Sequence, residues 1–145
     1  MSLGIASSAP FTFVLNEATR ILAVDDDPIQ LEFASAYLST PTASVETAES
    51  AEAGLLKLNS EPFDIALVDI QMPGMGGIEM IRRIRADPAL KNLPIVVVTG
   101  FDDIVSIDIA YEAGASSFIT KPVNWRLLSY HLRFVLRSHC LQGST

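Results

Sequence analysis

Short apolar runs recur along this chain, and four of them end at a residue that can hold a cation or a phosphate. These runs lead to Asp25, Asp69, Thr99 and Lys121. Helical patterns separate the runs, and this alternation is typical of a parallel β-sheet covered by helices. Parallel strands deliver their last residues to one edge of a sheet, where open α/β folds bind ligands, so we expect the four side chains to gather there.

The pattern predicts five strand–helix units. Strands are expected at about 20–24, 43–47, 64–68, 94–98 and 116–120, and helices at about 28–38, 51–58, 78–85, 102–113 and 125–137. The second strand is the most polar and is expected at an edge of the sheet, whereas the fourth is rich in β-branched residues and is expected to be buried on both faces. Candidate N-caps are Asp27, Ser50 and Asn124, and residues 72–77 are expected to form a loop.

The pattern assigns most of the chain to one domain. We expect that domain at 19–138, with an N-terminal extension at 1–18 and a C-terminal tail at 139–145. Within the extension, residues 11–15 are expected to form either a short extra strand or an arm that packs on the domain.

Composition excludes several classes of protein. The chain has 145 residues, is 49% hydrophobic and carries a formal net charge of −7, which indicates a globular domain and disfavours direct binding to nucleic acid. A single cysteine excludes a disulfide framework and favours a reducing, cytoplasmic location. No apolar run reaches the roughly 20 residues of a membrane-spanning helix, and residues 1–10 lack the basic residues of a signal peptide.

The acidic residues indicate a metal site. If the first and third strands are neighbours, about 4.8 Å apart, Asp25, Asp26 and Asp69 converge. Crowded carboxylates raise each other's pKa unless a cation lies among them, and Mg²⁺ is the hard cation that suits such oxygens. The alternative is a solvated acidic turn that caps the next helix, which explains Asp27 well but Asp25 and Asp26 poorly.

Three residues fit phosphoryl chemistry, although each has an ordinary structural role as its alternative. Asp69 precedes a Pro/Gly-rich loop and could attack phosphorus or only cap that loop. The Thr99 hydroxyl could bond a phosphoryl oxygen or belong to an ordinary strand residue. Lys121 could pair with a phosphate or lie on the surface before a turn. Each signal is weak alone, but together, on successive strand ends, they favour a site for a divalent cation and a phosphoryl group.

Five ordered pieces of the chain resemble the receiver domain of two-component response regulators, over about residues 19–138. The pieces are ILAVDDDP at 21–28, LVDIQMPGMGG at 67–77, VVTG at 97–100, GA at 114–115 and FITKP at 118–122. The resemblance implies a flavodoxin-like, doubly wound α/β fold, with five helices around a five-stranded parallel sheet of order 2-1-3-4-5. In that order the first and third strands are neighbours, as convergence of the acids requires.

The resemblance also implies a phosphoryl-transfer role for the matching residues. Asp69 would accept a phosphoryl group from the phosphohistidine of a sensor histidine kinase or a phosphotransfer protein. Asp25, Asp26 and Asp69 would hold Mg²⁺ together with the backbone carbonyl of Gln71, and Lys121 would pair with the phosphoryl group. Such a domain is regulatory rather than an enzyme, although it catalyses its own phosphorylation and dephosphorylation.

A switch is implied as well. Thr99 would move to bond the phosphoryl group, Phe118 would turn inward as the switch aromatic, and the Lys121–Pro122 peptide bond would be cis. The surface of helices four and five would then contact an output domain or form a homodimer. Both predicted helices carry more apolar residues than one core-facing stripe needs, and a wide buried stripe is the alternative to a partner surface.

Two residues depart from the family pattern, and two other functions stay open. Gly76 stands where an acidic residue is common and is expected to loosen its loop, while Phe101 is expected to screen the phosphoryl group from water. A phosphohydrolase of the haloacid dehalogenase type expects a second acid two residues after its nucleophile, where this chain has Gln71. A binding module of the same fold that no longer accepts phosphate is disfavoured by the retained site residues.

Overall fold

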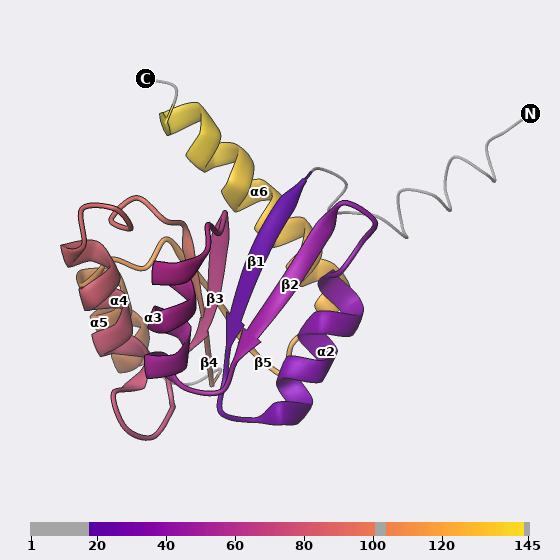
Figure 1. The fold of residues 1–145 in the computed structure, drawn as a ribbon. Helices are drawn as coiled ribbons and strands as arrows, with labels where there is room; N and C mark the ends of the chain where they lie inside the picture. The colour runs from indigo at the N-terminus through magenta and orange to yellow at the C-terminus, as the bar shows by residue number, and fades with distance from the viewer. Residues whose placement is uncertain (1–17, 101–103, 144–145) are drawn as a thin grey trace, which may run out of the picture.

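The computed structural model describes residues 18–100 and 104–143, in which one five-stranded sheet lies between two layers of helices (Figure 1). Its elements are β1 (Thr19–Val24), α2 (Pro28–Leu38), β2 (Ala43–Ala48), α3 (Ala51–Ser60), β3 (Ile65–Asp69), α4 (Gly76–Ala86), β4 (Ile95–Gly100), α5 (Ile104–Ala113), β5 (Ser117–Lys121) and α6 (Trp125–Gly143). All pairings are parallel and the order is β2-β1-β3-β4-β5. The predicted fold and strand order are confirmed.

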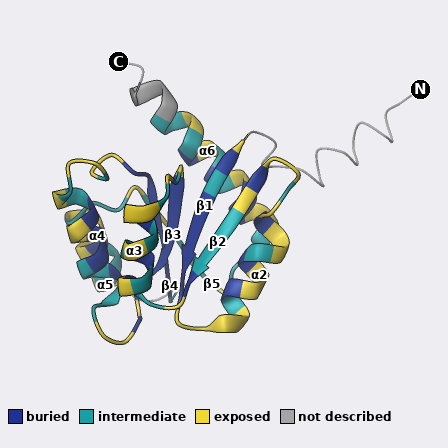
Figure 2. Ribbon diagram, in the orientation of Figure 1, coloured by how far each residue is buried: buried dark blue, intermediate teal, exposed yellow. Residues whose placement is uncertain are grey.

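Each face of the sheet has its own hydrophobic core. In β1, Ile21 and Ala23 pack in the core beneath α2 and α6, whereas Leu22 and Val24 pack in the core beneath α3, α4 and α5. This division follows from the two-residue period of a strand. The middle strands β1, β3 and β4 are buried almost throughout, and β2 is mixed because it forms an edge (Figure 2). The predictions of an edge position for the second strand and of full burial for the fourth are confirmed.

Local side-chain hydrogen bonds set the starts of three helices. The side chain of Asp27 accepts from the Ile29 N–H at 2.9 Å, and Pro28 occupies the first position of α2. Ser50 caps α3 and Asn124 caps α6 in the same way. A helix leaves its first N–H groups without internal partners, and these side chains supply them. The three predicted N-caps are confirmed.

Several element ends differ from the prediction, among them the start of α4 and the ends of β3 and α6. α4 begins at Gly76, because this glycine has φ +77° and turns the chain directly into the helix, so the predicted loop is wrong at its last two residues. β3 includes Asp69, which is paired with Val98 of β4. α6 ends at Gly143 rather than near Arg137, because no glycine or proline interrupts the sequence between them.

Several sequence predictions cannot be compared with the fold. Residues 11–15 and Phe101 lie outside the described residues, as do the first two residues of the predicted fourth helix. The last helix continues into the segment predicted as a tail, and the domain boundary at 138 stays a prediction.

Arg85, on the last turn of α4, joins three parts of the fold. Its guanidinium group donates to the backbone carbonyls of Gly114 at 2.8 Å, Leu93 at 2.6 Å and Lys91 at 3.0 Å, and to the Ser116 hydroxyl at 3.4 Å. Burial lowers the pKa of Arg85. Gly114 has φ +120°, and a β-carbon there would lie 2.6 Å from the Arg85 side chain, so the glycine that ends α5 also makes room for this contact.

Replacing Arg85 with methionine should destabilise the protein by about 2 kcal/mol, because the substitution keeps the apolar stem but removes the donors to the partly buried carbonyls of Gly114 and Leu93. Arg82→Met is the matched control on the same helix. Arg82 is exposed and, within residues 18–100 and 104–143, pairs with Glu79 alone, at 3.8 Å, so its loss should change stability by less than about 0.5 kcal/mol. Urea denaturation measures both, and equal effects would contradict this role of Arg85.

Candidate functional site

Three carboxylates meet where β1 and β3 end. These strands pair as neighbours up to Val24 and Val68, so the next residues lie together at the carboxyl edge of the sheet. The carboxylate oxygens of Asp25, Asp26 and Asp69 lie within 4.8 Å of one another. Asp25 is 8% exposed and Asp69 is 3% exposed, whereas Asp26 is open to solvent. The structure therefore brings together the three acids that the sequence expected to converge.

Lys121 comes from the end of β5, two strands away from Asp69. Its Nζ lies 3.2 Å from Asp69 Oδ2 and 3.7 Å from Asp25 Oδ2. Burial alone would lower the pKa of Lys121, but the attraction of Asp69 and Asp25 outweighs it and raises that pKa. The lysine therefore stays charged and faces both buried acids.

The acids are not fully neutralised by this lysine. Burial, together with the charge of Asp69, raises the pKa of Asp25 to about 6, against the hydrogen bond that the Asp27 N–H donates to Asp25 Oδ1 at 2.9 Å and the charge of Lys121. Three carboxylates around one ammonium group leave an excess of negative charge. Carboxylate oxygens at this spacing suit a hard divalent cation such as Mg²⁺. Among the described residues this is the one group of three side chains whose donor atoms could hold a metal together.

The loop after Asp69 is fastened to it by backbone groups. The Gln71 N–H donates to Asp69 Oδ1 at 3.2 Å, and the Gly77 N–H donates to the carbonyl of Ile70 at 3.2 Å. A β-carbon on Gly77 would collide with the carbonyl oxygen of Asp69 and would lie 2.9 Å from Ile70 Cα. Only glycine allows α4 to begin so close to the acid. Gly77 is not among the site residues predicted from sequence, although its signal was present as the second glycine of the Gly76–Gly77 pair.

Thr99 is buried at the end of β4 with its hydroxyl unused. The residue is 1% exposed, and its Oγ1 has no hydrogen-bond partner among the residues that the structure describes. A buried hydroxyl without a partner is uncommon, because its desolvation is not compensated. The group is thus available to a ligand that brings acceptor oxygens to this edge.

Phe118 lies on β5, three residues before Lys121. It is 37% exposed, and its ring meets the ring of Tyr111 edge-on with centroids 6.0 Å apart. An inward turn of Phe118 would break this contact, and Tyr111 is a partner that the sequence analysis did not identify. The peptide bond between Lys121 and Pro122 is cis, as the resemblance implied.

The excess apolar residues of the last two helices divide between core and surface. In α6, Leu128, Leu132 and Val135 are buried in the core that α2 and α6 cover. The exposed set spans α5, β5 and α6 and consists of Ile104, Val105, Ile109, Tyr111, Phe118, Leu127, Tyr130 and Phe134. We call this set the α5–β5–α6 surface. No helix among residues 18–100 and 104–143 is long and apolar enough to cross a membrane.

Comparison with known proteins gives one family. The model of the response regulator receiver domain matches residues 21–133. The heme response regulator HssR of Staphylococcus aureus is 32% identical over 126 residues, which are 87% of this chain and 55% of that protein. A cyclic di-GMP phosphodiesterase of Thermotoga maritima is 39% identical over 118 residues, which are 81% of this chain and 31% of that protein. The chain thus spans between about a third and about a half of these relatives.

Solved structures agree with the family model. A CheY-like receiver domain protein from Methanospirillum hungatei has a TM-score of 0.80 and 32% identity, and the match covers 88% of this chain and all of that one. A putative response regulator from Chloroflexus aurantiacus has a TM-score of 0.79 and 30% identity, with 83% and 99% covered. The strand order, the family model and these matches coincide, and the chain belongs to the family of response regulator receiver domains.

Proposed function

We propose that this domain is the phosphoacceptor of a cytoplasmic two-component phosphorelay. Asp69 takes a phosphoryl group from the phosphohistidine of a sensor histidine kinase or a phosphotransfer protein. The observation that carries the proposal is the position of Asp69, nearly buried, 3.2 Å from Lys121 and among two further carboxylates. The domain is regulatory. The phosphodiesterase relative is about three times as long as the matched region, so its named activity is not carried over.

The arrangement suits phosphoryl transfer because it positions groups and balances charge. A carboxylate oxygen of Asp69 forms the new bond to phosphorus while the bond to the donor imidazole nitrogen breaks, and the imidazole leaves with the electron pair. The Gln71 N–H holds Asp69 Oδ1, and Lys121 offers its charge to the incoming phosphoryl oxygens. When bound, Mg²⁺ would neutralise charge that develops on those oxygens. Asp25, Asp26, Asp69 and the Gln71 carbonyl would hold it.

The hydroxyl of Thr99 would couple phosphorylation of Asp69 to a change in the α5–β5–α6 surface. Phosphoryl oxygens on Asp69 supply an acceptor for the Thr99 hydroxyl, which has none among the described residues, so phosphorylation favours a Thr99 position closer to that edge. Such a movement opens space next to β5 for Phe118 to leave Tyr111 and turn inward. The α5–β5–α6 surface then changes shape, and it is apolar enough to contact an output domain or a second copy of the chain.

Incubation with Mg²⁺ and acetyl phosphate should add one phosphoryl group to the wild-type protein, as read by intact mass. Asp69→Asn should add none, because the amide is not a nucleophile toward phosphorus. Chelation of the metal should slow the reaction in the wild type. Circular dichroism is the folding control for both proteins. Failure of the folded wild type to gain mass, or an equal gain in Asp69→Asn, would contradict the proposal.

Thr99→Val should separate stability from switching. Valine has nearly the same shape and removes only a hydroxyl that has no described partner, so the free energy of unfolding should stay the same or rise by up to about 1 kcal/mol. Phosphorylation should still occur, but the change in the NMR signals of the Phe118 ring on phosphorylation should be lost.

Thr120→Val, directly across the β4–β5 ladder from Thr99, is the matched control and should keep that change. A clear loss of stability in Thr99→Val, or an unaltered Phe118 response, would show that the hydroxyl has another task.

Without metal, stability should fall as the pH rises from about 4 to about 6. The folded state raises the pKa of Asp25 from 3.8 to about 6, so between these values it binds more protons than the unfolded state. The stabilisation is present at low pH and is lost as Asp25 ionises, and we expect a loss on the order of 2 kcal/mol. Urea denaturation in EDTA at a series of pH values measures it. Asp25→Asn should lack this part of the fall, and parallel pH profiles for the two proteins would count against the raised pKa.

A further inference from the structure

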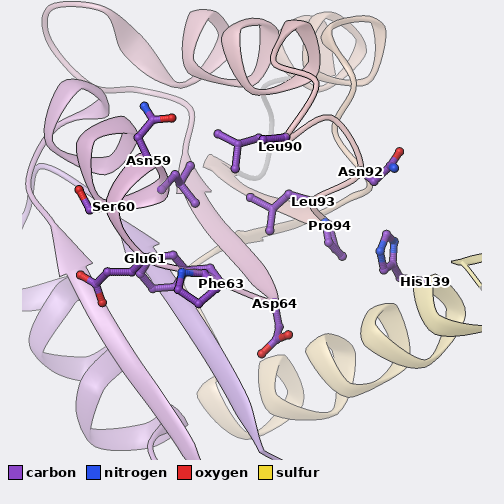
Figure 3. A pocket seen from close by; sticks show the side chains of 13 residues that line it. Asn59, Ser60, Glu61, Phe63, Asp64, Leu90, Asn92, Leu93, Pro94 and His139 are labelled. Atoms are coloured by element: carbon purple, nitrogen blue, oxygen red, sulfur yellow. The ribbon is translucent and has the colours of Figure 1, made fainter.

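A pocket of about 540 Å³ lies at the amino edge of the sheet (Figure 3). Asp25, Asp26 and Asp69 lie at the opposite, carboxyl edge. One wall is the connection between α3 and β3, residues 61–64, and the other is the connection between α4 and β4, residues 87–94. His139 of α6 stands at its rim. The volume falls within the roughly 300–1,000 Å³ of small-ligand pockets. Nothing in the proposed phosphoryl chemistry uses this pocket.

Arg20 of β1 holds the first wall. Its Nη1 donates to the carbonyl of Pro62 at 3.0 Å, and its Nη2 pairs with Glu61 Oε1 at 2.5 Å. The guanidinium carbon lies 4.8 Å from the centre of the Phe63 ring, over its face. These contacts fix the connection between α3 and β3 from outside the pocket, because Arg20 belongs to a neighbouring strand.

Arg85 holds the second wall. The same guanidinium group that reaches Gly114 also donates to the carbonyls of Lys91 and Leu93. The two walls are thus fixed by side chains of other elements, and the pocket exists before anything binds. A preformed pocket needs little ordering when it is filled, which favours binding.

The buried part of the pocket lining is apolar, and polar side chains, Glu61 and Asp64 among them, form much of the rest. Leu58, Leu93 and Pro94 are buried, and Phe63 and Leu90 are half-buried beside them. The polar side chains around this interior include Asn59 and Asn92, and both are exposed. Apolar side chains on an extended peptide fit such a site, because they cover the interior while the peptide backbone meets the rim.

The first strand of the domain starts at this edge. The Arg20 N–H donates to Asp64 Oδ2 and the Asp64 N–H donates to the Arg20 carbonyl, both at 2.8 Å, so β1 starts directly beside a residue that lines the pocket. Residues 11–15 read Phe-Thr-Phe-Val-Leu and precede Ala18 by three to seven residues. At about 3.5 Å per extended residue, this run reaches roughly 10 to 25 Å from Ala18.

We propose that residues 11–15 dock in this pocket of their own domain. Residues 1–17 carry a single charged side chain, Glu17, so burying the apolar run removes no lysine or arginine from water. The short connection to β1 makes the binding intramolecular, with an effective concentration on the order of millimolar. Docking would link the two walls and cover apolar surface that the fold leaves open.

The test is paramagnetic relaxation in the chain of 145 residues. Cys140→Ser removes the single thiol, and Thr12→Cys then carries a nitroxide label in the middle of the run. The backbone amide signals of Asn59, Leu90 and Asn92 should lose most of their intensity, whereas those of Leu127 on the α5–β5–α6 surface should keep it. Adding Phe11→Ser and Phe13→Ser should restore the lost signals, and Leu3→Ser is the matched control that should not.

Apart from Cys140→Ser in α6, which every labelled variant shares, the substitutions lie outside the described residues, so an unchanged remainder of the spectrum verifies folding. Even broadening over the whole domain, or broadening confined to another face, would overturn the proposal. A mixture of labelled protein and isotope-enriched unlabelled protein identifies the source. If the unlabelled copies lose the same signals, the occupant is a second copy and the intramolecular site is wrong. Loss confined to the labelled chain supports it.

Discussion

The attraction between Lys121 and two nearly buried carboxylates holds together an edge of the sheet that like charges would otherwise push apart. Asp25 and Asp69 reach this edge because β1 and β3 pair directly, and Lys121 reaches it from β5 across β4. One ammonium group does not balance three carboxylates, and burial together with the charge of Asp69 raises the pKa of Asp25. An edge that is stable enough to form yet short of positive charge favours both a divalent cation and a transferable phosphoryl group whose oxygens that cation and the lysine neutralise.

This constraint also explains the close packing around Asp69. The acid is nearly buried, so its carboxylate depends on a few fixed donors, namely the N–H of Gln71 and the ammonium of Lys121. Gly77 lets the start of α4 press against the backbone of Asp69 and so keeps the loop in place. Thr99 is the exception, since its hydroxyl is buried at the same edge without a described partner. The Asp69 carboxylate thus has hydrogen-bond donors, whereas the Thr99 hydroxyl has no described partner. The hydroxyl can therefore respond when phosphoryl oxygens are added at this edge.

The fold and the gathering of the site residues could be predicted from sequence, because all strands of a parallel sheet end at the same edge. The alternation of runs gave the sheet, and the resemblance gave the neighbours β1 and β3 that the acids needed. Contacts made by backbone atoms could not be predicted from sequence. Gly77, for example, has the pattern of a loop glycine until its distance to Asp69 is known. Arg85 reads as a surface arginine for the same reason, because its partners are carbonyls more distant in sequence. The end of α6 was misjudged because apolar periodicity fades before the helix does.

The two edges of the sheet use positive charge in opposite ways. At the amino edge, Arg85 donates mainly to backbone carbonyls, and Arg20 donates to the carbonyl of Pro62 and to the carboxylate of Glu61. Each arginine fixes a connection whose conformation would otherwise depend on loop residues alone. Arginine suits this task because its donors are several and rigidly spaced. At the carboxyl edge, Lys121 faces carboxylates as a single point charge and can turn to a phosphoryl group without losing a fixed geometry. The arginines therefore lie where the conformation of a connection is fixed. The lysine lies where phosphorylation would change the group that it faces.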